Sequence, residues 1–586
     1  MRSTQMTLAV GPHFKGSGAG DPLSHRGRNL VSEGGNQAQL RVSSTAQWRA
    51  QRARSMPWTG RVFVLGLAIA SPAIANDATD RAPLVSSSRA DDATDRAPLV
   101  SSSRADDATD RAPLVSSSRA DDGIDVTLPP GVSAHPYRIL LTSAAVLGLG
   151  TAWYLVDDRN VLDWDKPSLK SRLTGSSWRY DNNYFGMNFV LHPLFGAATY
   201  AAARDSHASV ASSFLVSLGT SMAWEFVIEY NERVSINDVL VTPIGGAALG
   251  EFAHKLGYYL SSAPSRRPSR SGLSWTLTPY TRIMELGCDD EPRRLHPVDS
   301  LGYASGLWHE FATDYGVSGL EREDGSSLVL HRFRASGVFR AFPGYLSPGS
   351  YSRWFHQADV SRLELLVDTS TKGTGFSIET DSTLVGYAYQ NLSVNGEGHS
   401  HAVGIAVGYS YQSSLAKGED ERRAWVGLPG VATDFYWAGA GLSSTFELRA
   451  FPVFAGVSSP AFSRFLSDRD GVRSKTVLDR EGYFYGWGFA GQARARQRFG
   501  ILNNDVSLRA ESVWSDEGLD RDQESVTEDT KASDVRASLS LRTWLDFGRS
   551  FVAGIEGSST LRVSKAGPTN LRLRQNIAGV WLGSRF

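Results

Sequence analysis

Bulky and small residues alternate over long stretches in the C-terminal half of the chain. A period of two recurs in residues 400–412, 482–499, 534–547 and 570–586. In the first of these, the bulky positions are Val403, Ile405, Val407, Tyr409 and Tyr411. Successive side chains of a β-strand point to opposite faces, so this period predicts strands. Residues 299–586 are therefore expected to form an antiparallel β-domain.

The alternation fits either a soluble sandwich, with its bulky face buried, or an outer-membrane barrel, with its bulky face toward lipid. Several strands exceed about 10 residues, as tilted membrane strands do. Short turns alternate with long polar loops such as 515–533, and about twelve strands fit between Leu301 and Phe586. These features favour a transmembrane β-barrel of about 12 strands, with a periplasmic β-domain as the alternative.

The chain ends in an aromatic residue, Phe586, with Val580 and Leu582 on the same alternating face. Such an end resembles the signal that the outer-membrane barrel assembly machinery reads, although Ser584 interrupts the apolar alternation. We therefore expect two partners, the barrel assembly machinery through Phe586 and the lipids of the outer membrane.

A helical pattern precedes the strands. Apolar stretches long enough for helices occupy residues 138–156, 185–203, 209–230 and 238–260. All are rich in Ala, Gly, Ser and Thr, which allow helices to approach closely. We expect a compact, periplasmic bundle of about four helices over residues 135–262, followed by a linker at 263–298. The helix at 139–156 is the exception, because it is also a candidate membrane anchor or a plug against the barrel.

The N-terminal region reads as an export signal followed by a tether. After Met56 come Arg61, a short apolar run and the motif Ala73-Ile74-Ala75, which is typical of a cleavable signal peptide. Residues 1–75 are therefore expected to be leader and signal, with Met56 as the true start. Three near-identical 15-residue repeats follow, and their few bulky apolar residues predict a disordered tether over 76–134.

Composition excludes several classes of function. The formal net charge is −1, so no basic surface for nucleic acid is expected. The single cysteine, Cys288, excludes an internal disulfide and any zinc or iron–sulfur site that needs several thiolates. No cofactor is expected.

The helical stretch also carries acids. Glu225 and Glu229 lie four residues apart, on one face of a helix. Ser235 or Asn237 is expected to cap the next helix, with Asp238 in its first turn. We expect these acids to be structural, paired with Arg233 or fixing loops, because an unpaired buried carboxylate costs several kcal/mol. Acid–base catalysis and metal binding are the alternatives, although a di-iron site needs two Glu-x-x-His motifs and only Glu251-x-x-His254 is present.

Three segments of this region resemble the bacterial "domain of unknown function 3943" family. The resemblance covers about 80–110 residues near 181–260 and implies no established reaction. The matching positions are Asn188, His192-Pro193, Gly196, Trp224-Glu225, Glu229, Ser235, Asp238, Thr242-Pro243, Gly245-Gly246 and Gly250-Glu251. From these we select candidate functional residues and assign neither a catalytic nor a metal-binding role. They are Asn188, His192, Glu225, Glu229, Asp238 and Glu251.

The sequence thus predicts an α+β multidomain protein, with a small-residue helical bundle before a transmembrane barrel. The expected role is non-enzymatic, in transport, lipid handling or structure of the outer membrane. One alternative is a hydrolase of lipid or peptidoglycan that uses the acids of the helical domain. Another is an anion-selective pore lined by arginines, and the oligomeric state is left open. The proposed lining arginines are Arg536, Arg542, Arg572 and Arg574.

Overall fold

The computed structural model describes residues 134–157, 167–262, 268–285, 299, 301–303, 305–323, 325–416, 419–468, 481–520, 530–548 and 550–586. The predicted signal peptide and the repeats of the predicted tether lie outside these residues. Cys288 also lies outside them.

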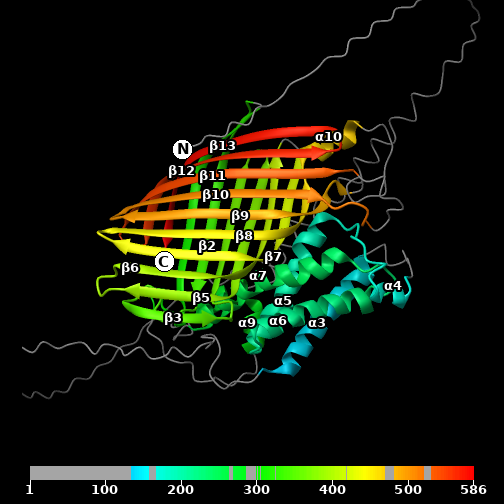
Figure 1. Cartoon of the computed structure of the whole chain (residues 1–586), viewed down its shortest axis with the longest axis horizontal. Helices are drawn as coiled ribbons and strands as arrows, with labels where there is room; N and C mark the ends of the chain where they lie inside the picture. Colours follow the sequence, from blue (N-terminus) through cyan, green and yellow to red (C-terminus); the bar gives the residue numbers. More distant parts are fainter. Residues whose placement is uncertain are drawn as a thin grey trace, which may run out of the picture. The chain divides into compact units, whose positions relative to one another are not determined.

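Thirteen β-strands lie within the described residues and form one antiparallel sheet (Figure 1). Pairing of β5 with β6 closes this sheet into a ring. Strands β3 and β4 both pair with the same side of β5. Strand β4 pairs with the first half of β5 and β3 with the second half, so the two strands together occupy one position in the ring. The prediction of a barrel of about 12 strands is therefore confirmed. The strands are β1 (Trp308–Arg322), β2 (Ser327–Arg340), β3 (Gly349–Phe355), β4 (Val360–Ser370), β5 (Gly373–Leu392), β6 (Gly398–Ala416), β7 (Glu419–Gly439), β8 (Leu442–Ser458), β9 (Phe484–Phe499), β10 (Leu502–Ser515), β11 (Ala532–Phe547), β12 (Phe551–Ala566) and β13 (Thr569–Arg585).

Ion pairs between strands that are not neighbours identify the face of the sheet that lines the lumen. Arg362 of β4 binds Glu447 of β8 at 2.9 Å, and Arg340 of β2 binds Asp434 of β7 at 3.1 Å. Such pairs can form only across the interior of the ring. The opposite face is apolar, and its side chains, such as Phe489, point outward and are exposed.

The lumen is filled at one end by apolar side chains as well as by ion pairs. Helix α10 (Pro460–Asp468), in the β8–β9 connection, contacts β7, β12 and β13. Its Phe462 and Phe465 belong to a buried cluster with Phe451 of β8 and Phe484 of β9, which lie on the lumen face. This helix therefore packs over the lumen rather than over the outer wall.

Nine helical segments precede the strands within the described residues. The segments η2 and η3 are short π-helical turns that lead into α5 and follow α6. The predicted linker at 263–298 contains two short helices, α8 and α9. The segments are α3 (Pro136–Asp157), α4 (Leu169–Leu173), η2 (Met187–Leu191), α5 (His192–Asp205), α6 (Val210–Ala223), η3 (Trp224–Ile228), α7 (Ile236–Ser261), α8 (Pro268–Leu277) and α9 (Pro279–Glu285).

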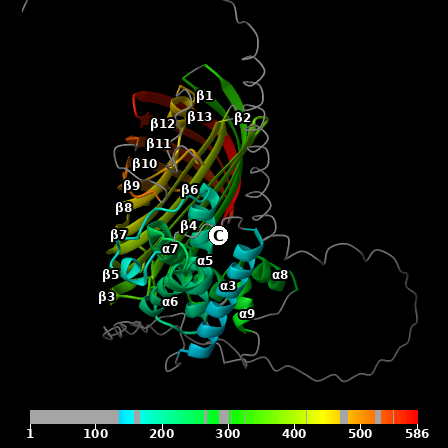
Figure 2. The same cartoon turned by 90° about the vertical axis from the view of Figure 1, so that its right-hand side faces the viewer.

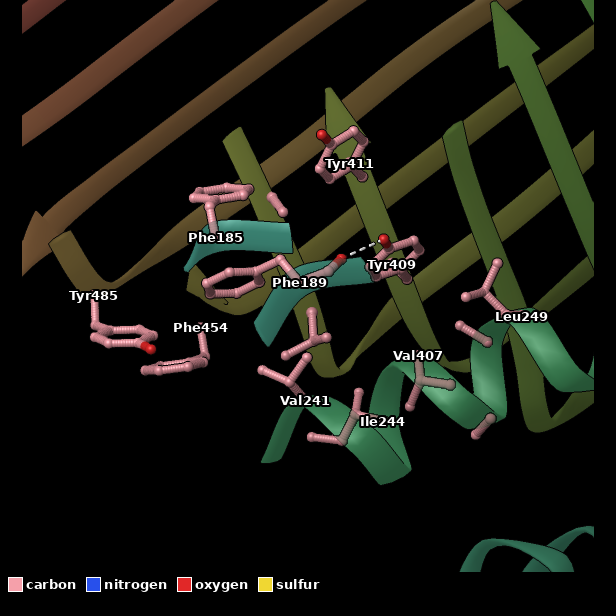
Figure 3. Close-up of a cluster of buried hydrophobic side chains, with 14 of the residues drawn as sticks. Phe185, Phe189, Val241, Ile244, Leu249, Val407, Tyr409, Tyr411, Phe454 and Tyr485 are labelled. Atoms are coloured by element: carbon pink, nitrogen blue, oxygen red, sulfur yellow. Dashed lines mark hydrogen bonds between the residues drawn. The ribbon is translucent and has the colours of Figure 1, made fainter. Parts of the chain in front are cut away.

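Four of these helices, α3, α5, α6 and α7, form the predicted bundle, and the bundle packs against the outer wall of the barrel (Figure 2). The outward side chains of β6 show where it does so. Ile405 is 49% exposed, whereas Tyr409, further along the same face, is 2% exposed. Figure 3 shows Tyr409 beside Phe189 of η2, whose carbonyl oxygen accepts a hydrogen bond of 2.6 Å from the Tyr409 hydroxyl.

Helix α7 runs across the outer wall of the barrel. In its first half, Gly245 lies against Val426 of β7, in the half of that strand nearer the β8–β9 connection. Near its C-terminus, the Tyr259 ring lies 5.4 Å from the ring of Phe311, at the start of β1. At 26 residues, α7 is about 39 Å long, comparable with the thickness of a bilayer.

This arrangement differs from one expectation. The helix predicted at 139–156 does not plug the lumen, because α3 contacts α5 and α6 instead. The periplasmic placement of the bundle stays a prediction, and its helices lie alongside the strands. The physical reason is the patch of outward aromatic residues on β6, β8 and β9, which the bundle covers and buries.

Candidate functional site

The acidic residues of the bundle meet where one helix ends and the next begins. Segment η3 carries Glu225 and ends at Ile228, and Glu229 follows as its C-cap. The chain then turns, and Ser235 caps α7 by accepting a hydrogen bond of 3.3 Å from the backbone N–H of Asp238. The predicted N-cap and the position of Asp238 in the first turn are thus confirmed.

Four of the six candidate residues come together here. Carboxylate oxygens of Glu225, Glu229 and Asp238 all lie within 4.8 Å of one another. The Nε2 atom of His192, at the start of α5, lies 3.4 Å from Oδ2 of Asp238. On the other side of the ring, its Nδ1 atom lies 3.4 Å from Oγ1 of Thr242. We refer to Glu225, Glu229, Asp238 and His192 as the acidic site.

Hydrogen bonds satisfy only part of the fully buried Glu225 side chain. Its Oε2 atom accepts a hydrogen bond of 2.6 Å from the backbone N–H of Ser235, whereas its Oε1 atom has no hydrogen-bond partner. The nearby cation, Arg172, donates to main-chain carbonyls, including that of Glu225 itself. Its charge is close to the cluster, but its hydrogen bonds go to the backbone.

Within the part of the chain that the structure describes, no lysine or arginine forms an ion pair with Glu225, Glu229 or Asp238. The predicted pairing of these acids with Arg233 is therefore wrong. The helix end directs the carboxylates toward one another instead. For Glu229, which lies in the turn beyond η3, burial and the neighbouring carboxylates of Glu225 and Glu232 raise the pKa well above its usual range.

A cavity of about 220 Å³ opens beside the acidic site. Val146, Leu147 and Gly150 of α3 form one side of it, and Trp224 contributes a large aromatic surface. Its polar groups include His192, Glu229, Asp238 and Thr242. An apolar cavity with a few converging polar groups is typical of a ligand site. This one suits a molecule with an apolar body and a polar head.

Asn188 has a different place in the fold. Its side-chain N–H groups donate to Oδ1 of Asp181 at 2.7 Å and to the hydroxyl of Tyr483 at 3.0 Å, and they also donate to the hydroxyl of Tyr485. Tyr483 and Tyr485 lie on the outer wall at the start of β9. Asn188 therefore fastens the bundle to the barrel, and the aromatic alternation in 482–499 was the available signal for its partners.

Glu251 does not join the acidic site. It lies four turns further along α7, where its Oε2 atom accepts hydrogen bonds of 2.9 Å from both Arg204 and Tyr200. Lys255 is 3.3 Å from its other oxygen. The neighbouring His254 pairs with Asp205, so Glu251-x-x-His254 does not contribute to a di-iron site. These are structural ion pairs inside the bundle.

Asp181 and Arg172 were not predicted to belong to the surroundings of the site, and Asn237 was considered only as a possible helix cap. Asn237 donates a hydrogen bond of 2.7 Å to Oδ1 of Asp238 and accepts one of 3.1 Å from the backbone N–H of Asp181. It therefore orients one acid and fixes the loop that carries another. The contact between Asn237 and Asp181 joins residues 56 positions apart, which no local pattern reports.

No curated protein matches the sequence. Three solved structures illustrate what the barrel is similar to. The translocator domain of the autotransporter NalP from Neisseria meningitidis is 10% identical, with a TM-score of 0.21, and the match covers 48% of this chain and 88% of that one. The β-domain of the Bordetella autotransporter BrkA is 10% identical, with a TM-score of 0.19, and the match covers 47% of this chain and 98% of that one. A refined porin structure is 10% identical, with a TM-score of 0.16, and the match covers 48% of this chain and 100% of that one.

The helical region matches a family model over residues 177–280, described as "Domain of unknown function (DUF3943)". This segment includes all six candidate residues, and it begins shortly before the loop that carries Asp181. The match confirms the resemblance found in the sequence motifs. The chain therefore combines a region that matches the DUF3943 family model, at residues 177–280, with a closed antiparallel β-barrel of 12 strands that follows it.

Proposed function

We propose that this protein is an outer-membrane barrel that carries its helical bundle beside it within the membrane and handles a lipid-like molecule in the cavity of that bundle. The role is lipid handling rather than passage of solutes through the lumen. The periplasmic location that the sequence predicted for the bundle is replaced, in this proposal, by a position alongside the barrel wall.

The observation that carries the proposal is the apolar outer surface of the bundle. Among the described residues, two helices are long and apolar enough to cross a membrane, Pro136–Val156 and Val210–Ile228. Only 6% of the first is buried, and its exposed side chains include Leu140, Leu149 and Val156. The outward face of the barrel continues this surface with residues such as Ile555 and Leu582. Surfaces of this size in water mark interaction sites, and lipid is the partner that covers both at once.

The lumen also favours lipid handling over passage of solutes, because ion pairs between opposite strands extend across it. Arg494 of β9 binds Asp505 at 2.6 Å and also pairs with Glu364 of β4, across the ring. Arg496 of β9 binds Glu310 of β1 and Glu447 of β8, each at 2.8 Å. These ion pairs narrow the lumen beside a cavity of about 310 Å³ that Arg494 and Glu364 help to line. A wide open channel, as the pore alternative requires, is therefore disfavoured.

The four arginines proposed for a pore divide between the two faces. Arg536 and Arg542 lie on the lumen face, where Arg542 binds Asp314 at 3.0 Å. Leu573 lines the lumen. Side chains of a strand alternate between its two faces, so the neighbouring Arg572 and Arg574, which are exposed, lie on the outer face. The expectation that Arg572 and Arg574 line the interior was therefore wrong. Their place near the β12–β13 turn suits contact with water or lipid headgroups.

Fractionation of native membranes tests the location. We expect the protein in the outer-membrane fraction, with a band whose migration in SDS changes on boiling, because a closed barrel resists SDS until it is heated. A band in the inner-membrane fraction that is insensitive to heat would contradict the proposal.

Spin labelling tests the position of the bundle. Leu149, 74% exposed on α3, is replaced by cysteine in a Cys288→Ser background. The spin label is expected to be relaxed more by oxygen, which partitions into lipid, than by a water-soluble nickel chelate. Val394→Cys, 90% exposed in the β5–β6 turn, is the control and is expected to show the reverse. If both labels respond mainly to nickel, the bundle lies in water and its periplasmic placement is favoured.

The hydrolase alternative is favoured by one observation, the carboxylates of Glu229 and Asp238 at the edge of the cavity. Two neighbouring carboxyl groups, one of which donates a proton while the other accepts one, are the arrangement that general acid–base hydrolysis uses. Release of fatty acid from labelled phospholipid by the purified protein, lost in Glu229→Gln, would establish this activity. No release would leave lipid handling without chemistry as the function.

A further inference from the structure

We propose that the acidic site binds one divalent cation of the Mn²⁺ or Zn²⁺ type, through carboxylate oxygens of Glu225, Glu229 and Asp238 and the Nε2 atom of His192. The sequence had favoured a structural role for these acids and had assigned no metal. This inference goes beyond the proposed function, since neither the location of the bundle nor the lipid enters it.

The spacing of the ligand atoms suits a small cation. One oxygen from each of the three carboxylates lies within 4.8 Å of the others. Bonds of about 2.1 Å place opposite ligands about 4.2 Å apart and adjacent ligands closer. Small rotations of the carboxylate groups are enough to bring the three oxygens to these distances. His192 lies outside this group of three, but its Nε2 atom is 3.4 Å from Oδ2 of Asp238, so we place it as the fourth ligand, on the side of Asp238.

The unpartnered oxygen of Glu225 is a second, separate indication. The side chain is fully buried, and its Oε1 atom accepts no hydrogen bond from a protein donor among the described residues; the side chain's acidic neighbour, Asp238, is itself a carboxyl group. A buried carboxylate without a partner is costly, so such groups are paired or coordinate metals. The same bundle provides a comparison in Glu251, which is equally buried but is bound by Arg204, Lys255 and Tyr200. Within the described residues, Glu251 is thus bound directly by protein cations, whereas the cation near the acidic site, Arg172, donates to main-chain carbonyls.

The surroundings hold the ligands in position, as metal sites require. The backbone N–H of Ser235 fixes Oε2 of Glu225 at 2.6 Å, and the side chain of Asn237 fixes Oδ1 of Asp238 at 2.7 Å. Thr242 lies 3.4 Å from Nδ1 of His192, which directs the other ring nitrogen to the cluster. Contacts of this kind orient ligands and sharpen the affinity for metal.

The donor set selects the type of cation. Three carboxylates and one imidazole combine the oxygen ligands that suit Mn²⁺ with the nitrogen ligand that suits Zn²⁺. No thiolate is present among the four residues, so a soft ion such as Cu⁺ is disfavoured. The adjacent cavity leaves room for water to complete the coordination of the cation.

Mn²⁺ titration of the full-length protein, purified in detergent with its barrel folded, tests the site. After treatment with a chelator, the protein is titrated with Mn²⁺ while electron paramagnetic resonance measures the free ion. We expect one Mn²⁺ to bind per chain, competition by Zn²⁺, and an affinity at least about tenfold lower in Glu229→Gln and in Asp238→Asn. Asp205→Asn is the control, because Asp205 is a buried acid of the same bundle that pairs with His254 away from the site. Its affinity is expected to equal that of the unmodified protein.

A second readout protects the test against a variant that fails to fold. The spectrum of Mn²⁺ bound to the unmodified protein should contain a nitrogen coupling from His192, which His192→Gln removes. Absence of binding to the unmodified protein would overturn the proposal. Equal affinity in Glu229→Gln and in the unmodified protein would overturn it as well. Neither outcome affects the spin-label test of the location of the bundle.

Discussion

Replacing Gly246 by alanine is expected to unpack the helical bundle while the barrel remains closed. A Cβ atom at this position of α7 would lie 2.5 Å from the carbonyl carbon of Gly196 in α5 and 2.8 Å from its oxygen. The obstacle is backbone, which no change of rotamer can move aside. The two helices must therefore separate, at a cost of about 1–3 kcal/mol or more in the stability of the bundle.

Limited proteolysis combined with the shift on boiling measures this effect. In Gly246→Ala, cleavage between α3 and α7 should accelerate several-fold, while the heat-dependent shift of the barrel stays in place. Gly219→Ala is the matched control, because nothing lies within 4 Å of a Cβ atom at this position of α6. Alanine there should be neutral or slightly stabilising. Equal protection of the bundle in both variants would contradict the close α5–α7 contact.

The barrel was largely predictable because its strands are specified by a pattern of neighbouring residues in the sequence. Side chains in strands alternate faces, so bulky positions such as Ile405 and Leu539 could be assigned to the outer wall from their spacing alone. The rule failed near the end of the chain. Arg572 and Leu573 alternate as expected, but Leu573 lines the lumen and Arg572 points outward. Near a turn, the outer face of a strand is no longer apolar. There, the polarity of a side chain alone does not show whether it faces the lumen or points outward.

The position of the bundle was not predictable for a related reason. Tyr409 and Tyr485 continue the same aromatic faces that meet lipid elsewhere on the wall, yet both are buried under the bundle. A residue covered by helices and one covered by lipid give the same pattern in the sequence. Only the three-dimensional pairing of η2 and α7 with the wall separates the two cases.

The acidic site was predictable only in part. The spacing of Glu225 and Glu229 places them on one face of a helix, and the cap at Ser235 fixes Asp238 nearby. Glu251 was grouped with them because it belongs to the same family motif. Its partner Arg204 lies 47 residues away in the sequence, so its separate role depends on how α5 packs against α7.

Replacing Arg362 by alanine is expected to destabilise the barrel more than the loss of any exposed arginine. Arg362 binds Asp381 of β5, Glu447 of β8 at 2.9 Å and Gln492 of β9 at 3.0 Å, so it connects strands on opposite sides of the lumen. Removing it leaves two buried carboxylates with fewer cations. The loss of one partner from a buried ion pair costs about 3–5 kcal/mol, and Arg449 and Arg496 retain part of the compensation.

The temperature at which the folded band converts to the unfolded one in SDS measures this loss. Arg362→Ala should convert several degrees lower than the unmodified protein. Arg498→Ala is the control, because Arg498 is 62% exposed and lies 3.6 Å from Asp546. A surface pair of this kind contributes about 0–1 kcal/mol, so its conversion temperature should change little. Equal temperatures for both variants would mean that the backbone ladder of the ring alone holds the barrel closed, and that the ion pairs across the lumen serve to obstruct it.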